Sequence, residues 1–62
     1  MTKLQPISML KIVQIMSGLI EDWMVSRVFT KNGKEVWVRG FGSTRREALL
    51  DFDAEVQTEE LY

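Results

Sequence analysis

The side chains of this 62-residue chain that could take part in chemistry are carboxylates, lysines, arginines and hydroxyls, because histidine and cysteine are absent. The general bases that remain are carboxylates, lysines and the N-terminal amine. Asp51 and Asp53 lie two residues apart, a spacing that points two groups in different directions on a helix. No serine has a residue nearby in the sequence that would activate its hydroxyl. We therefore predict a protein that is not an enzyme.

The same composition argues against metals and cofactors. Disulfides and the usual zinc and iron ligands are excluded, and the carboxylates do not match a calcium-loop spacing. Gly40-Phe41-Gly42 precedes a potential helix, but it lacks the third glycine and the lysine of phosphate-binding loops. We expect a strand-to-helix corner that needs unusual backbone angles instead. No metal and no cofactor are predicted.

Binding chemistry is better represented, in a stretch where large side chains alternate. Trp37, Arg39 and Phe41 occupy every second position, so they would share one face of a strand. Tryptophan and arginine are enriched at the hot spots of protein interfaces, and exposed aromatic patches mark interaction surfaces. The candidate partner-binding residues are Met24, Val28, Trp37, Arg39 and Phe41.

A β-hairpin is the element expected to position these residues. Two runs rich in valine and aromatic residues, 23–30 and 35–41, flank an Asn32-Gly33 pair. Asn-Gly supplies the two positive φ angles of a type I′ turn, which would set Val28 opposite Trp37. The face expected to form the core carries Trp23, Val25, Arg27, Phe29, Val36, Val38 and Gly40.

A helix is expected directly after the hairpin. Thr44-Arg45-Arg46-Glu47 matches a capping box, in which Thr44 accepts the N3 amide proton and Glu47 reaches back to the cap. Apolar residues then recur at helical spacing, so a helix over about residues 45–57 would lay this stripe on the sheet. The stripe consists of Ala48, Leu49, Phe52 and Val56.

Residues 8–20 are compatible with two structures. Regularly spaced polar residues suggest a helix that ends at Gly18. The β-branched Ile12, Val13 and Ile15 favour a strand near residues 9–16 that pairs with residues 23–30. We favour the strand, and periodicity leaves the helix open. The segment could also fold across the aromatic surface and bury it within the monomer.

The predicted fold class is α+β: a two- or three-stranded antiparallel sheet with a C-terminal helix packed on one face. Residues 1–62 form a single domain, in which residues 1–7 and 58–62 are expected to be loose. Such a short chain buries little surface, so we expect a protein partner, with a homodimer as the first candidate. The absence of cysteine fits a reducing cytoplasm. The apolar residues 7–20 are too short and too interrupted to span a membrane.

Charge is unevenly distributed, although the formal net charge is only −1. The middle of the chain is basic, which raises nucleic-acid binding with Trp37 stacking on a base as an alternative function. The end of the chain is acidic, and it is open whether these carboxylates imitate nucleic-acid phosphates or form an ordinary surface. The candidate nucleic-acid-binding residues are Lys31, Lys34, Arg39, Arg45 and Arg46.

Residues 33–57 also resemble a known structural unit. A strand, a glycine-containing corner and a capped helix that opens with Glu47-Ala48-Leu49 are similar to the HicB antitoxin family and to the last strand and helix of double-stranded-RNA-binding folds. The resemblance rests on these residues with Gly42 and Thr44, and it implies hairpin–helix geometry without an activity. The short length also resembles accessory proteins of phages and mobile elements.

Overall fold

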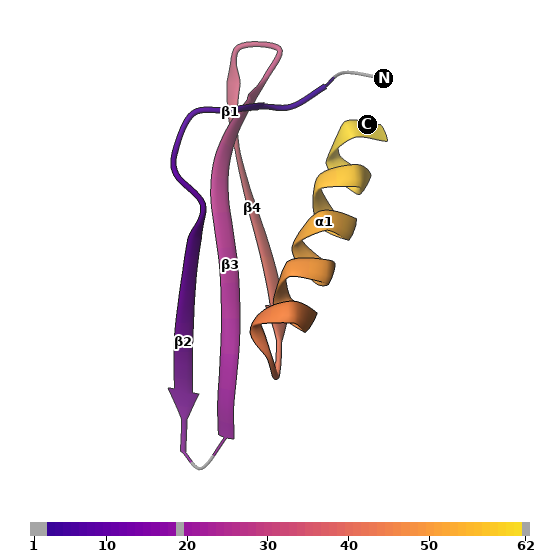
Figure 1. Ribbon diagram of the computed structural model, residues 1–62. Coiled ribbons are helices and arrows are strands. Elements are labelled where there is room, and N and C mark those ends of the chain that lie inside the picture. The colour runs from indigo at the N-terminus through magenta and orange to yellow at the C-terminus, as the bar shows by residue number, and fades with distance from the viewer. Residues whose placement is uncertain (1–2, 19, 62) are drawn as a thin grey trace.

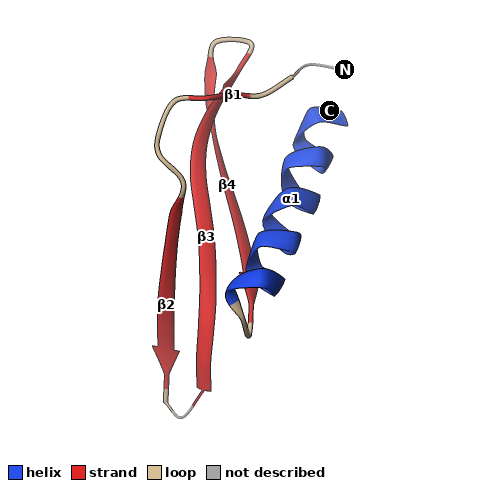
Figure 2. Ribbon diagram, in the orientation of Figure 1, coloured by secondary structure: helices blue, strands red, loops and turns tan. Residues whose placement is uncertain are grey.

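The computed structural model describes residues 3–18 and 20–61, which form one antiparallel sheet and a C-terminal helix (Figure 1). The helix lies against one face of the sheet (Figure 2), so the predicted α+β class is confirmed. The elements are β1 (Gln5–Pro6), β2 (Lys11–Ser17), β3 (Ile20–Lys31), β4 (Lys34–Gly42) and α1 (Arg45–Leu61).

The long strand β3 organises the sheet. Along one edge it pairs with β4, while β2 and β1 share its other edge. Ser8 fills the break between β1 and β2: the Val28 N–H donates to the Ser8 hydroxyl at 2.9 Å, and the Ile7 N–H donates to the Val28 carbonyl at 3.0 Å. Residues 8–20 therefore contain the strand rather than the helix, but β2 pairs with residues 20–26 instead of 23–30.

The β3–β4 hairpin has the predicted turn and register. Asn32 and Gly33 have φ angles of 54° and 78°, as a type I′ turn requires. Phe29 pairs with Val36 and Val28 with Trp37. Because the turn residues alone set this pairing, the division of side chains between the two sheet faces follows from the sequence.

The hydrophobic core lies between α1 and the predicted face of the hairpin. Phe29 and Phe52 stack there with ring centroids 6.2 Å apart. Arg27, the charged residue within the predicted core face, donates from Nε to the Ser8 carbonyl at 2.8 Å and lies over the Phe29 ring. The buried residues are Leu4, Val25, Phe29, Val38, Ala48 and Phe52, with Trp23, Val36, Leu49 and Val56 packed around them.

Gly40 is required by close packing rather than by backbone angle. A Cβ built on Gly40 would lie 2.2 Å from the backbone nitrogen of Phe52. Among the described residues, positive φ angles occur only at Gly18, Asn32 and Gly33. The prediction of unusual backbone angles at residues 40–42 is therefore wrong, because these residues belong to β4. Glycine is needed at position 40 because α1 packs directly on the strand.

Both ends of α1 differ in detail from the sequence-based expectation. The Glu47 N–H donates to the Thr44 hydroxyl at 3.1 Å, as a cap requires, but the Glu47 carboxylate accepts from Ser43 instead of Thr44. The helix continues to Leu61, and its Glu60 carboxylate accepts the Leu4 N–H at 3.1 Å. Residues 4–7 and 58–61, expected to be loose, are thus part of the packed structure, while residues 1–2 and 62 of the same expectation lie outside the described residues.

The β2–β3 hairpin extends past the N-terminal end of α1 (Figure 1), in a chain whose principal extents are 41 × 18 × 15 Å. Because α1 packs mainly on β4 and then on β3, β2 lies outside the two-layered part of the molecule. Within residues 3–18 and 20–61, no helix combines the length and the apolar character needed to cross a bilayer.

Candidate protein-binding face of the sheet

The sheet face opposite α1 is covered by no segment of the described chain, and we call it the open face (Figures 1 and 2). Val25, Phe29 and Val38 point to the helix, so the residues between them in sequence point to the open face. The open face comprises Lys11, Val13 and Ile15 of β2, Asp22, Met24, Ser26, Val28 and Thr30 of β3, and Glu35, Trp37, Arg39 and Phe41 of β4.

Two large aromatic side chains stand out from this face. Trp37 is 61% exposed and Phe41 is 53% exposed, whereas Met24 and Val28 beside them are half-buried. The N-terminal segment does not fold across them, because β2 extends the sheet sideways instead. The structure therefore brings all five candidate partner-binding residues together on one uncovered surface.

Arg39 gives the open face a positive centre. Its guanidinium carbon lies 5.8 Å from the centroid of the Trp37 ring, within the range of a cation–π interaction. Ser26 and Lys11 continue the same row across β3 and β2. The row of Arg39, Ser26 and Lys11 therefore carries two positive charges across the face. It separates an apolar row from the apolar pair of Val28 and Trp37. The apolar row consists of Phe41, Met24 and Val13.

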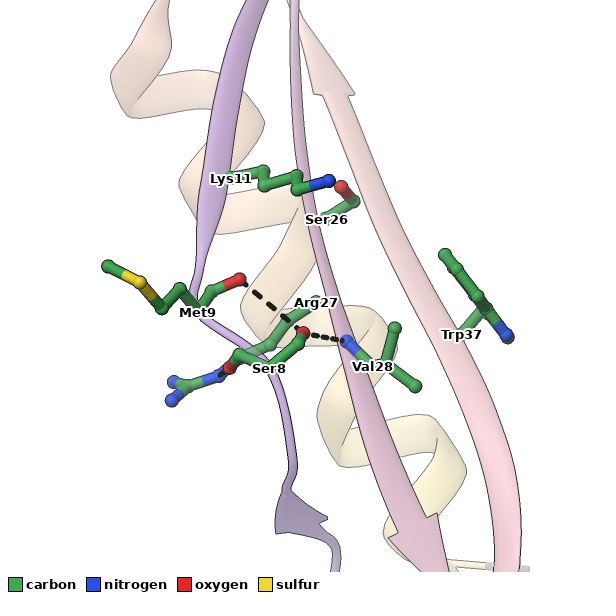
Figure 3. Close-up of a pocket in the computed structure, with 7 residues that line it drawn as sticks. All are labelled: Ser8, Met9, Lys11, Ser26, Arg27, Val28 and Trp37. Atoms are coloured by element: carbon green, nitrogen blue, oxygen red, sulfur yellow. Dashed lines mark hydrogen bonds between the residues drawn. The ribbon is translucent and has the colours of Figure 1, made fainter.

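A shallow hollow of about 240 Å³ lies beside Trp37, where the chain passes from β1 to β2 (Figure 3). Ser8 holds this passage against β3 through its contacts with Arg27 and Val28. The hollow combines an apolar wall with polar groups. Its lining consists of Ser8, Met9, Lys11, Ser26, Arg27, Val28 and Trp37.

Sequence reasoning missed the contribution of β2 to the open face. Lys11, Val13 and Ile15 extend the surface by one strand, but Ile12 and Met16 on the other side of β2 are apolar as well. A strand whose two sides are both apolar shows no period-two pattern, which is the signal that assigns residues to faces.

The five candidate nucleic-acid-binding residues do not share a surface. Lys31 and Lys34 pair next to the turn, and the Lys31 ammonium donates to the Glu59 carbonyl at the C-terminal end of α1. Arg45 and Arg46 lie at the opposite end of this 17-residue helix, where the Arg45 guanidinium lies 5.3 Å from the centroid of the Trp23 ring. Arg39 alone belongs to the open face.

Several carboxylates of the acidic segment hold the fold together. Glu47 accepts from Ser43, Glu60 accepts from the Leu4 N–H, and Asp51 accepts from the Phe41 N–H at 2.8 Å. In the described parts of the chain, no three acidic residues come together in a group that could hold a metal ion.

No family model, no curated protein and no solved structure matches this chain. Residues 33–57, the segment that resembles the HicB family, contain β4, the corner that follows it and most of α1. Common ancestry with that family stays a prediction.

Proposed function

We propose that this protein is a non-enzymatic binding module whose open face docks on another protein. The observation that carries the proposal is the exposure of Trp37 and Phe41 on a face that the described chain leaves uncovered. An exposed aromatic patch of this kind marks an interaction site, and tryptophan and arginine dominate interface energies.

The basic residues at the centre of the open face favour a particular partner chemistry, while the acidic Asp22 and Glu35 lie toward the two ends of β3. Lys11 and Arg39 lie in one row across the sheet. If two copies stacked their open faces about a two-fold axis through this row, the positive charges of one copy would meet those of the other. A partner that places apolar side chains over Trp37 and Phe41 and a carboxylate near Arg39 avoids this repulsion. We therefore propose a protein partner with an acidic, apolar surface rather than a second open face.

The biological role that fits is a small regulatory or inhibitor protein of the kind found among phage and mobile-element accessory proteins. Function in the cytoplasm fits a chain without cysteine, since disulfides characterise oxidising compartments.

A random peptide library selected on the immobilised protein tests the proposal. Selected peptides are then titrated against wild type, Trp37→Ala and Leu50→Ala. Leu50 is a matched control because it is also 61% exposed but lies on α1. We expect acidic, apolar peptides that lose about 30-fold in affinity with Trp37→Ala, the loss of a hot-spot residue, and nothing with Leu50→Ala. Peptides that bind all three proteins equally would contradict the proposal.

A second candidate function is the binding of single-stranded nucleic acid. It is favoured by the combination of Trp37 and Phe41 with Arg39 and Lys11 on one sheet face, since single-strand-binding sheets combine aromatic and basic residues. Fluorescence anisotropy with labelled single-stranded DNA and RNA tests it at two salt concentrations. Phosphate-dominated binding weakens steeply as salt rises, whereas binding to an apolar peptide surface does not.

A further inference from the structure

We propose that the outer edge of β2 pairs with β2 of a second copy of this chain, about a two-fold axis that passes through Gln14. This interface adjoins the open face and shares Lys11, Val13 and Ile15 of β2 with it, but it does not involve Trp37 or Phe41. The proposal does not rest on the proposed function.

The first observation is the unusual exposure of β2. Ile12, Val13, Ile15 and Met16 are between 37% and 66% exposed, on both sides of the strand. β2 lies at one end of the strand order, and α1 packs on β4 and β3. Exposed edge strands are normally protected by charges, proline or bulges. Residues 12–16 contain none of these, which is typical of a strand that another strand covers.

The second observation is the direction of the backbone groups. The N–H and C=O of Val28 bond with Ser8 and Ile7, so they point to the β1–β2 side of β3. Bonding direction alternates along an antiparallel strand, so Met24 and Ser26 also point to that side and bond their partners Val13 and Lys11. The intervening residues Ile12, Gln14 and Met16 therefore direct their N–H and C=O groups outward.

The third observation is that β2 is self-complementary. Gln14 is the midpoint of Lys11–Ser17, so a two-fold axis at Gln14 lets the two strands overlap over their whole length. On the α1 side of the sheet, Ile12 then lies opposite Met16 of the second copy, and on the open face Val13 lies opposite Ile15. Apolar residues therefore meet apolar residues on both faces, with Lys11 at the ends of the pairing.

The other sheet edge cannot serve in the same way. At Gly40 the helix backbone packs directly on β4, and Asp51 accepts the outward N–H of Phe41. A second copy added there would have to displace the Asp51 carboxylate from the Phe41 N–H, and it would place two helices over neighbouring strands on the same face. At the β2 edge, four strands separate β4 of one copy from β4 of the other, so the helices lie far apart on the same face.

Gln14→Pro and Gln14→Ala form a matched pair that tests this interface. Both substitutions remove the hydrogen bond from the side-chain amide of Gln14 to the Glu21 carboxylate. Only proline also removes the outward backbone N–H of residue 14. Proline is tolerated on an edge strand whose N–H faces solvent. Sedimentation velocity should give twice the 7.2 kDa chain mass for wild type and Gln14→Ala, and the monomer mass for Gln14→Pro. An amide correlation spectrum of Gln14→Pro shows whether the core signals of Val25 and Phe52 are retained.

Single cysteines test the register independently of proline, because the chain has none of its own. Gln14→Cys places two thiols in a directly opposed pair with Cα atoms about 5.5 Å apart, within reach of a disulfide. In Ile12→Cys the cysteine of one chain lies four residues away from the position opposite the cysteine of the other chain. The two thiols are then roughly 14 Å apart along the strands. Oxidation should cross-link Gln14→Cys efficiently and leave Ile12→Cys monomeric in denaturing electrophoresis.

Three results would overturn the proposal: a wild type that stays at the monomer mass as concentration rises, a folded Gln14→Pro that dimerises like Gln14→Ala, or equal cross-linking at positions 12 and 14. The open face is tested separately, because Trp37→Ala should remain dimeric. Loss of peptide binding by a Trp37→Ala protein that stays dimeric would support both assignments, whereas loss of the dimer in Trp37→Ala would place the dimer interface on the open face.

Discussion

The Asp51 carboxylate accepts a hydrogen bond from the backbone N–H of Phe41 at 2.8 Å, joining α1 to the outer edge of β4. Phe41 pairs with Met24, whose backbone groups point to β2, so the Phe41 N–H faces away from β3. The side chain of Asp51 thus occupies an edge position that a further strand would otherwise use. The two edges of the sheet differ for this reason: β4 is capped and covered by the helix, whereas β2 is open.

Replacing Asp51 should destabilise the fold, although the carboxylate lies at the surface. Asp51→Ala removes one charge-assisted hydrogen bond and should lower the free energy of unfolding by about 0.5–1.5 kcal/mol, as measured by urea denaturation. Asp53→Ala is the matched control, since it removes an exposed carboxylate from the same helix. Equal effects of the two substitutions would show that the Phe41 contact contributes nothing.

Only one of the two threonines near or within the helix should lose stability when it is replaced by alanine. Thr44 accepts the Glu47 N–H as the N-cap, so Thr44→Ala should lower the free energy of unfolding by about 1 kcal/mol. The Thr58 hydroxyl donates to the Ala54 carbonyl within the helix, where alanine has the higher helix propensity. Thr58→Ala should therefore be neutral or stabilise by a few tenths of a kcal/mol. Thermal unfolding followed by circular dichroism distinguishes these outcomes.

Gly40→Ala should disrupt the packing of α1 on β4. The new methyl group would meet the backbone of Phe52 and Ala48 within 2.6 Å, and backbone atoms cannot rotate away. We expect a loss of about 3 kcal/mol, at the upper end for overpacking. Gly18→Ala serves as the control: its φ of +67° is unfavourable for alanine, but no atom lies within 4 Å. It should cost only about 1–2 kcal/mol. A Gly40→Ala chain as stable as this control would contradict the close approach of helix and strand.

The two tryptophans should differ in their access to solvent. Trp23 packs against the core beneath Arg45, whereas Trp37 lies on the open face. Each variant with one tryptophan reports on the tryptophan that remains: Trp37 in Trp23→Phe, and Trp23 in Trp37→Phe. The fluorescence of Trp37 should have the longer emission wavelength and should be quenched more strongly by acrylamide than that of Trp23. If the chain dimerises through β2, the acrylamide quenching of Trp37 should stay unchanged as the protein concentration rises. Protection of Trp37 on self-association would instead place the dimer interface on the open face.

The sequence by itself determined the features that depend on neighbouring residues. Asn32-Gly33 specifies a type I′ turn, the turn specifies the pairing of Val28 with Trp37, and Thr44 marks the first turn of the helix. These are local because a turn type or a cap depends on a few consecutive residues. The placement of Trp37 and Phe41 on the face away from α1 followed from the same pairing.

Only the tertiary structure decided how distant segments meet. Whether residues 8–20 form a strand, and with which part of β3 it pairs, could not be derived, because both sides of β2 are apolar and alternation gives no register. The contacts of Asp51 with Phe41 and of Glu60 with Leu4 join residues 10 and 56 positions apart. Gly40 likewise has its role only because a helix formed by later residues packs on it. Such contacts depend on the geometry of the whole chain, which local propensity does not contain.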